Sequence, residues 1–402
     1  MTAGKGLCPH VTIVTAFPEF FGDFLSTSIL GRAVKNGLVR VELVDLREFG
    51  RGGYRQIDDY AFGSGGMVLA APQLLDALNE ARRRGGGEPF VVYPSPQGAL
   101  LTQDIVETLA QQEHVVIFCG HYEGMDERFV EREVDLEVSV GDCVLTGGEI
   151  PAMMIVDAIS RLVPGVVGRG GPAGGELSSA VAEDSFYRGM LDHPHYTRPA
   201  SWEGLDVPPV LLSGNEAEVL AWRRARAVER TLSRRPDLLA RAAIGDYLAG
   251  GVYLAARLTE GESLEALAAL SGLCRFYGLG RPFLMVSDPE RRRALGRETT
   301  PLDPAPRIVG GWRRLLEWIR SHEGDAPLLT VQVQSGPVEG ALHCLEVKRR
   351  CLEWRGPVLF LLAGGEGPEE GEVLVTSLMR GPEDLPLEVR AAIALDRFLG
   401  KR

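Results

Sequence analysis

The sequence lacks the features that define several large classes of protein. None of its apolar runs approaches the roughly 18 residues that a membrane-spanning helix needs, and its first residues do not follow the pattern of a signal peptide. Its six cysteines form no CxxC pair and no cluster with histidine, which argues against a disulfide framework and against structural zinc. These absences predict a cytoplasmic protein with reduced cysteines and no membrane partner.

Nucleotide-binding fingerprints are missing as well. The sequence has no GxGxxG after a strand-like run, no GxxxxGK[ST] and no GxSxG. Dehydrogenases with dinucleotide cofactors, P-loop NTPases and α/β hydrolases with a nucleophilic serine are therefore disfavoured. The formal net charge of −12 argues against nucleic-acid binding through overall positive charge, and against DNA as a partner, but it leaves room for a local basic patch.

The chain shows two successive patterns of alternating strands and helices. Near-continuous apolar runs between helix-like stretches predict an α/β fold whose parallel strands are buried on both faces. In the first pattern the expected strands cover residues 11–17, 39–46, 89–96, 114–120 and 138–148, with a helix over 72–84. In the second they cover 252–258, 282–288, 327–334 and 357–365, with a helix over 387–399.

A glycine-rich stretch and an arginine-rich stretch separate the two patterns. Residues 222–241 carry seven arginines against two acidic residues, a local net charge of 7 − 2 = +5. That composition suits a surface that follows RNA phosphates, and it suits a solvated amphipathic helix nearly as well, because arginine is also a good helix former. We expect four segments: an α/β domain over 1–165, a flexible linker over 166–189, a small helical domain over 190–248 and a second α/β domain over 249–402.

Three strand ends of the first pattern run into loops that contain glycine. They are YPSPQG (93–98), CGHYEG (119–124) and VGDCVLTGGE (140–149). Ligands of open α/β sheets bind beyond the carboxyl ends of the strands, and glycine lets the backbone approach them closely. One such loop is usually a plain turn, but three in one domain favour a ligand site lined by backbone groups.

Eight collinear strings over residues 10–240 closely resemble the bacterial tRNA (guanine-N1)-methyltransferase family, TrmD, of the SPOUT class. The strings are GRAVKNG (31–37), SPQG (95–98), YEGMDER (122–128), GDCVLTGGEIPAM (141–153), SRLVPGV (160–166), EDSF (183–186), HPHYTRP (193–199) and VPPVLLSGN (207–215). The resemblance implies a trefoil-knotted α/β domain, S-adenosylmethionine as cofactor, Mg2+ as a further ion that no ligand spacing locates, and a homodimer. The implied reaction is methylation of guanine 37 in tRNA.

The resemblance also implies which residues form the site. The three glycine-containing loops would line the cofactor pocket, through Tyr93, Ser95, Pro96, Gly120, Tyr122, Glu123, Val140, Gly141, Asp142, Cys143, Val144, Leu145, Gly147 and Gly148. The residues matched to tRNA contact are Arg55, Asp58, Ser185, His195, Arg198 and Arg223.

The chemistry asks for a general base. Guanine N1 carries a proton at neutral pH, and it becomes a good nucleophile only when that proton leaves. Asp184 matches the base of the family, although without the resemblance it is an ordinary solvated acid. Arg161 matches the catalytic arginine, and its alternative is a surface ion pair. His193 and His195 show no nearby acidic partner, so we predict no metal site there.

Some positions depart from the family pattern. Tyr54 and Glu216 stand where histidine is common, His121 replaces an arginine, and Cys143 replaces an aromatic residue. These departures bear on substrate affinity and on the tightness of the cofactor pocket, and they support an alternative in which the protein binds RNA without catalysis. A hydrolase that uses Glu123 or Glu149 would need a nucleophile motif that is absent.

The last segment resembles a second SPOUT-like RNA methyltransferase domain. The resemblance rests on CRFYGL (274–279), LLAGGEGP (361–368) and GPEDLPLEVRAAIALDRFLG (381–400). Leu385 and Pro386 stand where polar residues are usual. We therefore favour a scaffolding or RNA-positioning role over a second active site that methylates another RNA position.

Overall fold

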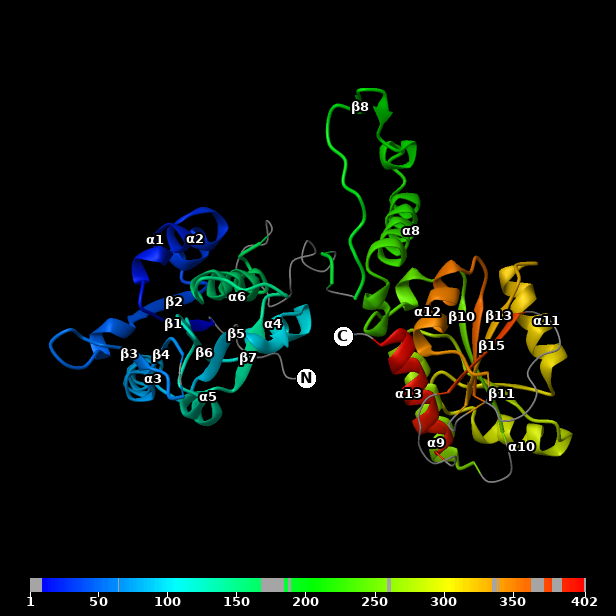
Figure 1. Ribbon diagram of the computed structural model, residues 1–402. Coiled ribbons are helices and arrows are strands. Elements are labelled where there is room, and N and C mark those ends of the chain that lie inside the picture. Colours follow the sequence, from blue (N-terminus) through cyan, green and yellow to red (C-terminus); the bar gives the residue numbers. More distant parts are fainter. Residues whose placement is uncertain are drawn as a thin grey trace. The chain divides into compact units, whose positions relative to one another are not determined.

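The computed structural model describes residues 9–63, 65–167, 184–186, 189–258, 262–334, 338, 340–362, 372–377 and 385–400. The chain forms two compact units, Met1–Asp184 and Ser185–Arg402. Each is a mixed α/β unit with a parallel sheet (Figure 1), so the predicted fold class is confirmed at this level. Most of the expected linker, residues 168–183 and 187–188, lies outside the described residues. In the described ranges no helix has the length and apolarity to cross a membrane.

Five parallel strands form the sheet of the first unit, in the order β2-β1-β6-β5-β7. They are β1 (His10–Thr15), β2 (Arg40–Asp45), β5 (Phe90–Leu100), β6 (His114–Phe118) and β7 (Leu136–Ser139). The prediction of a strand over 138–148 was wrong for most of that range, because β7 ends at Ser139. Gly141 has φ of +143°, and the Ser139 hydroxyl bonds to its backbone, so the chain turns there instead of extending.

Helices cover both faces of this sheet. One face packs against α3 (Ala71–Gly85) and α5 (Glu127–Glu133), and the other against α1 (Gly22–Ser26), α2 (Ser28–Lys35), α4 (Gln103–Ala110) and α6 (Glu149–Arg161). The predicted helix over 72–84 is α3, which ends because Gly86 adopts a left-handed conformation. A hairpin of β3 (Asp58–Tyr60) and β4 (Met67–Leu69) precedes α3.

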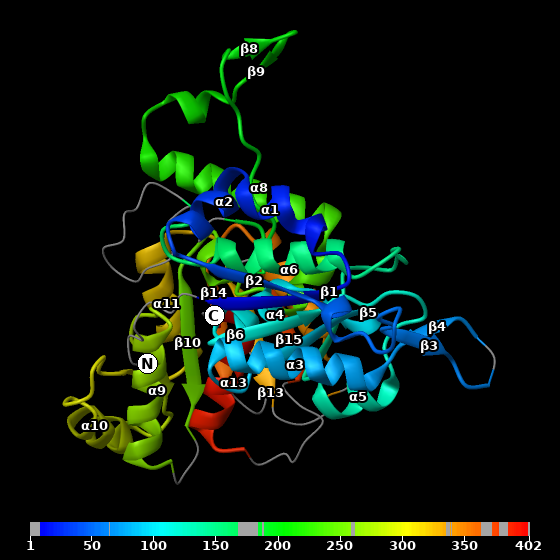
Figure 2. The ribbon, with the colours of Figure 1, turned by 90° about the vertical axis from the view of Figure 1, so that its left-hand side faces the viewer.

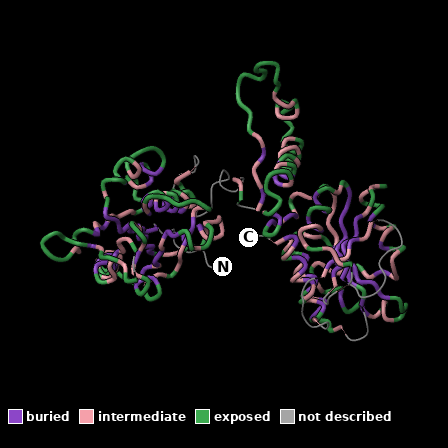
Figure 3. Tube along the Cα trace, in the orientation of Figure 1, coloured by how far each residue is buried: buried purple, intermediate pink, exposed green. Residues whose placement is uncertain are grey.

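The second unit begins with an arm. Its long helix is α8 (Glu216–Arg234), which Asn215 caps, and its tip is the hairpin of β8 (Ser201–Trp202) and β9 (Leu205–Asp206), shown in Figure 2. Most of the tip is exposed (Figure 3), whereas α8 buries Ala227, Val228 and Thr231. Residues 222–234 of the arginine-rich stretch therefore lie on a helix with one buried side, and a 3-10 helix over Pro236–Ala240 follows.

Six parallel strands form the second sheet, in the order β12-β11-β10-β14-β13-β15. They are β10 (Val252–Arg257), β11 (Phe283–Met285), β12 (Arg307–Val309), β13 (Leu329–Gln334), β14 (Val358–Leu362) and β15 (Glu372–Ser377). The helices are α9 (Leu264–Phe276), α10 (Pro289–Glu298), α11 (Trp312–Glu323), α12 (Cys344–Glu353) and α13 (Leu387–Leu399). The four expected strands are present, with the first three shorter than expected, and the helix over 387–399 is confirmed. Residues 363–365 of the last expected strand lie outside the described residues.

The two sheets share a strand order. The order β11-β10-β14-β13-β15 in the second sheet corresponds to β2-β1-β6-β5-β7 in the first. When these five strands are numbered along the chain in each unit, corresponding strands have the same number, the same neighbours and the same parallel direction. In both units a helix follows the last of these strands, α6 in the first and α13 in the second. The chain therefore builds one parallel topology twice and adds β12 at an edge of the second sheet.

Candidate active site

The three predicted glycine-containing segments lie on adjacent strands, but the first was wrong as a loop: residues 93–98 belong to β5, whose pairing with β7 shifts register between Pro94 and Ala99. The other two are loops that follow β6 and β7. Because β6, β5 and β7 are parallel neighbours, their carboxyl ends share one edge of the sheet. The Gly148 N–H donates to the Gly120 carbonyl over 2.9 Å. A Cβ atom on Gly148 would lie 2.7 Å from the Cys119 Cα, and one on Gly120 would lie 2.8 Å from the Tyr93 ring. Glycine is needed at Gly148, where the two loops approach to backbone contact, and at Gly120 a side chain would displace the Tyr93 ring.

Apolar side chains of these loops face solvent. Val144 is 86% exposed, Tyr122 62% and Leu145 39%, while Ser95 is buried. The other predicted cofactor residues lie in the same three segments: Tyr93 and Pro96 in β5, Gly120 and Glu123 after β6, and Val140, Gly141, Asp142, Cys143, Gly147 and Gly148 after β7. Exposed apolar groups beside close-packed backbone fit a ligand with an aromatic base and an aliphatic sulfonium chain, so the residues present suit S-adenosylmethionine.

The β3–β4 hairpin packs on the loop after β6. Glu123 N–H donates to the Met67 carbonyl over 3.1 Å, and Leu69 N–H donates to the Gly124 carbonyl over 2.9 Å. Tyr122 has φ of +59°, a left-handed conformation that strains a tyrosine backbone. Its pKa is raised by desolvation and then by Asp58, so a predicted tRNA residue lies beside a predicted cofactor residue. Arg55 lies in the exposed turn just before β3.

A buried polar network that sequence reasoning missed supports the loop after β6. Glu149, the first residue of α6, is 5% exposed and accepts from the Thr15 hydroxyl over 2.7 Å. The His121 Nε2 lies 2.9 Å from both carboxylate oxygens of Glu149. The family pattern has an arginine at the position of His121. His121 still offers a donor to Glu149, so that carboxylate keeps a partner. The signal in the sequence was an acid directly after two glycines at a helix start.

Burial makes the nearby thiol inert. Desolvation raises the pKa of Cys119 well above its usual value, and the charge of Glu149 acts in the same direction. The reactive thiolate form is therefore strongly disfavoured. Cys119 contributes packing between the sheet and α6.

The two predicted catalytic residues contact each other. Arg161, the last residue of α6, places Nε 2.9 Å and Nη2 2.6 Å from the same oxygen, Oδ2, of Asp184. Both side chains are partly exposed, 44% for Arg161 and 35% for Asp184. Within the described part of the chain, the second carboxylate oxygen of Asp184 has no hydrogen-bond partner.

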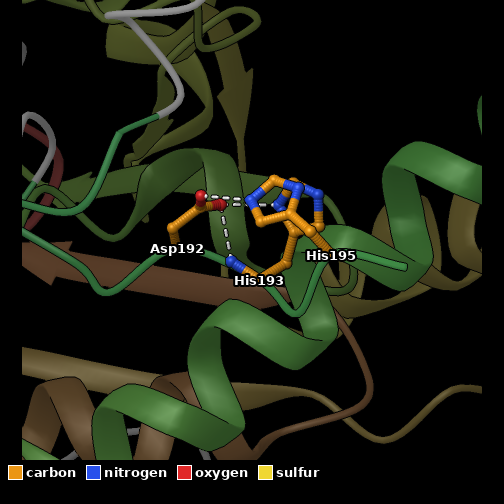
Figure 4. A group of neighbouring side chains, drawn as sticks. All are labelled: Asp192, His193 and His195. Carbon is orange, nitrogen blue, oxygen red and sulfur yellow. Dashed lines mark hydrogen bonds and ion pairs between the residues drawn. The ribbon is translucent and has the colours of Figure 1, made fainter. Parts of the chain in front are cut away.

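The other predicted tRNA residues lie in the second unit. The Ser185 hydroxyl accepts from the Asp192 N–H over 2.9 Å, and His195 Nε2 lies 2.7 Å from the Asp192 Oδ2 (Figure 4). Arg198 is exposed, and Arg223 is half-buried on α8.

The statement that His193 and His195 lack an acidic partner was wrong. Asp192 pairs with both, and its Oδ1 lies 2.6 Å from the His193 Nδ1. The residue next to a histidine was overlooked because spacing alone does not show which way adjacent side chains turn. Burial lowers the pKa of His193, and the charge of Arg223 adds to that shift against the opposite effect of Asp192.

Comparison with known proteins defines the class and then the family. The fold is that of an α/β protein whose candidate site lies at the carboxyl ends of parallel strands. A family model described as tRNA (Guanine-1)-methyltransferase TrmD matches residues 10–241. The chain belongs to this family. The match ends before β10, so it covers the first unit and the arm but not the second sheet.

Curated relatives named tRNA (guanine-N(1)-)-methyltransferase are similar over the same length. The relative from Moorella thermoacetica is 50% identical over 234 residues, which is 58% of this chain and 90% of that protein. The relative from Magnetococcus marinus is 51% identical over 236 residues, 58% of this chain and 89% of that protein. The relative from Ruminiclostridium cellulolyticum is 44% identical over 227 residues, 56% and 94% respectively.

Proposed function

We propose that the protein transfers a methyl group from S-adenosylmethionine to N1 of guanine 37 in tRNA, with Asp184 as the general base. Membership of the TrmD family supports the reaction type. The observation that carries the assignment to residues is the contact between Arg161 and Asp184. This contact joins an acid and a guanidinium that lie 23 residues apart in the chain.

The geometry suits proton removal. Both Arg161 donors bind Oδ2 of Asp184, which leaves Oδ1 to accept the proton of guanine N1. Arg161 holds the carboxylate in one orientation, and its charge stabilises negative charge that develops on guanine O6 as the proton leaves. Since both side chains are partly exposed, a base that is turned out of its RNA stack can reach them.

The cofactor supplies an electrophilic methyl group on a sulfonium centre. We assign its binding to the carboxyl-terminal half of β5 and to the loops after β6 and β7, where Val144, Leu145 and Tyr122 offer apolar contact and backbone groups around Gly120 and Gly148 offer hydrogen bonds. The network of Thr15, His121 and Glu149 positions the middle loop. We further propose that these loops form a trefoil knot, as in the SPOUT class.

A metal step is not part of this proposal. Among the described residues, one group of three or more possible metal ligands comes together, and it holds two imidazoles. Mg2+ prefers oxygen ligands, so that group does not fit Mg2+. We route no step through this ion.

Substrate contact is assigned to Arg55, Asp58, Ser185, His195, Arg198 and Arg223. The arm offers arginines on the exposed side of α8, where they are able to follow phosphates. We further propose a cytoplasmic homodimer as the working form, divided into the segments 1–165, 166–189, 190–248 and 249–402.

For the second sheet we propose a SPOUT-like relative of the first domain that positions RNA. Its support is the shared strand order. The loop with Gly364, Gly365, Glu366 and Gly367 lies outside the described residues, and Leu385 and Pro386 add no polar side chain before α13. No catalytic residue is assigned there.

Single-turnover methyl transfer tests the main proposal. Radiolabelled S-adenosylmethionine is mixed with excess enzyme and unmodified tRNA transcript, and with a transcript in which adenine replaces guanine 37. Asp184→Asn is expected to slow transfer by about 10² to 10⁴-fold. Asp325→Asn, an exposed acid of the second unit, is the matched control and is expected to keep the wild-type rate.

The outcomes separate the alternatives. Loss of transfer both with Asp184→Asn and with the adenine transcript supports guanine 37 and the base. Transfer that survives in both would move the active site to the second unit. Tight tRNA binding without any transfer by the wild-type protein would favour a binding protein.

A further inference from the structure

A trio of possible metal ligands lies in the second unit, apart from the sheet-edge site. Asp192, His193 and His195 each offer one ligand atom, and these atoms all lie within 4.8 Å of one another (Figure 4). The Asp192 carboxylate faces both rings from one side, with Oδ1 2.6 Å from the His193 Nδ1 and Oδ2 2.7 Å from the His195 Nε2. The ring centroids are 4.4 Å apart.

The backbone holds this trio in place. Leu191 N–H donates to the Thr231 hydroxyl of α8 over 2.9 Å, and Asp192 N–H donates to the Ser185 hydroxyl over 2.9 Å. Pro194, between the histidines, restricts the backbone further because its ring limits φ. His193 is 7% exposed, so one ring is fixed by packing. The ligands are therefore anchored before any ion arrives, which reduces the entropic cost of binding.

We propose that Asp192, His193 and His195 bind one divalent cation of the zinc class. Two imidazole nitrogens and one carboxylate oxygen form a donor set that suits zinc, cobalt, nickel or copper. The same set disfavours Mg2+ and Ca2+, which take oxygen ligands.

Binding exchanges the hydrogen bonds of the trio for metal bonds. Zinc binds nitrogen and oxygen ligands at about 2.0 to 2.2 Å, so the two rings and the carboxylate need small rotations to face one ion. Each ring nitrogen that now donates a proton to Asp192 must release it, and the proton goes to solvent. The chain supplies three ligands within the described residues, and His195 is exposed, so water or a phosphate oxygen completes the coordination.

One nearby charge limits the affinity. Arg223 lies close enough to His193 to affect its titration, and a guanidinium repels a dication. The single carboxylate of Asp192 opposes this repulsion. We therefore expect reversible binding that a chelator removes, not a permanent structural ion.

Metal titration of the full chain without a polyhistidine tag tests the proposal. Zn2+ is titrated in competition with a chromophoric chelator, and Co2+ binding is followed by its visible absorption bands, which report the ligand geometry. We expect one ion per chain, with Mg2+ in large excess failing to displace it. Asp192→Asn and His195→Ala are each expected to weaken Zn2+ binding at least about tenfold, because each removes one ligand.

The matched control is His322→Ala, which removes an exposed histidine of α11. It is expected to leave Zn2+ affinity unchanged. Circular dichroism and thermal melting without metal verify that the variants fold, and exposed His195 gives the variant that keeps the core intact. The proposal is overturned if the wild-type chain binds no Zn2+, or if affinity is the same in wild type, Asp192→Asn and His195→Ala. It is also overturned if His322→Ala weakens binding as much as they do.

Discussion

The two parallel sheets repeat one strand order but bury different side chains. In the first sheet His10 of β1 pairs in register with His114 of β6. At the matching positions of the second sheet, Val252 of β10 pairs with Val358 of β14. The residue that begins the helix after the last of these strands also differs between the units. It is Glu149 in α6 and Leu387 in α13, and both are buried.

The shared strand order provides the scaffold of both units, whereas the candidate site needs side chains that differ between them. Parallel strand order depends on crossovers and packing, which apolar residues satisfy in both units. Burying polar groups costs desolvation. Thr15, His121 and Glu149 hold the loop after β6, which the family match covers, whereas His10 and His114 lie at the amino ends of β1 and β6. The second unit has Leu387 where the first has Glu149, so the same strand order is built without this polar network, and fold alone does not carry the activity.

The tryptophans allow each unit to be followed separately. All five lie at or beyond Trp202, in the second unit, so tryptophan fluorescence reports that unit alone. Hydrogen exchange of peptides from β1 and β6 reports the first unit. The comparison is therefore testable in the intact chain.

Acid is expected to act mainly on the first unit. Burial, with the charge of His10 second, lowers the pKa of His114 to about 4 from 6.5. Folding favours the neutral imidazole of His114. Its contribution to the free energy of unfolding is therefore complete above pH 6.5 and is lost as the pH falls toward 4. The loss is roughly 3 kcal/mol. Denaturant unfolding at stepped pH, with exchange of β1 and β6 peptides, measures it.

The variant His114→Val, which copies Val358, is the control for this prediction. In this variant the free energy of unfolding of the first unit is expected to change less between pH 6.5 and pH 4 than in the wild type. His10 and Glu42 still titrate in the variant, and the charge of Arg40 still acts on both. An equal acid loss in wild type and variant would contradict the role of His114.

Gly148→Ala is expected to slow methyl transfer by about 100-fold, because its Cβ collides with the backbone of Cys119 and Gly120 and displaces the loops. Calorimetric titration with S-adenosylmethionine separates a binding defect from a chemical one. Wild-type affinity and rate in this variant would show that the close approach of the two loops is dispensable.

Glu149→Leu gives the first unit the helix start of the second. The change leaves the donors of Thr15 and His121 without their acceptor and is expected to cost about 2 kcal/mol in the first unit. Glu149→Gln keeps an acceptor and is expected to cost less. Urea unfolding followed by hydrogen exchange measures both, with the tryptophan transition unchanged. Equal stability of Glu149→Leu and wild type would refute the network.

The smallest effect is expected for Gly272→Ala in α9. A Cβ at this position meets nothing within 4 Å. Alanine in a helix interior is favoured over glycine, so the second unit gains about 0.5 to 1 kcal/mol. The tryptophan transition in urea measures this gain. A destabilised variant would mean that α9 packs more tightly there than its open space indicates.

Sequence reasoning located the elements well and the networks poorly. The apolar runs that form β1, β6 and β10 were predicted as strands, because parallel strands that are buried on both faces are continuously apolar. No range was predicted for α1, α2, α4, α5, α6, α9 to α12, the β3–β4 hairpin or the edge strand β12. Asp192 was missed as a partner of His193, since the direction of a side chain is not a property of spacing.

The sequence by itself determined the α/β class, the glycine-containing loops after β6 and β7 and, through eight matching strings, the family. These features are local, and each is read within a few consecutive residues. Only the tertiary structure decided which distant groups meet. It joins Thr15 to Glu149 across 134 positions, sets Arg161 on Asp184 across 23, and repeats one strand order in two units. Such contacts depend on how helices pack across a sheet, and no local pattern encodes that packing.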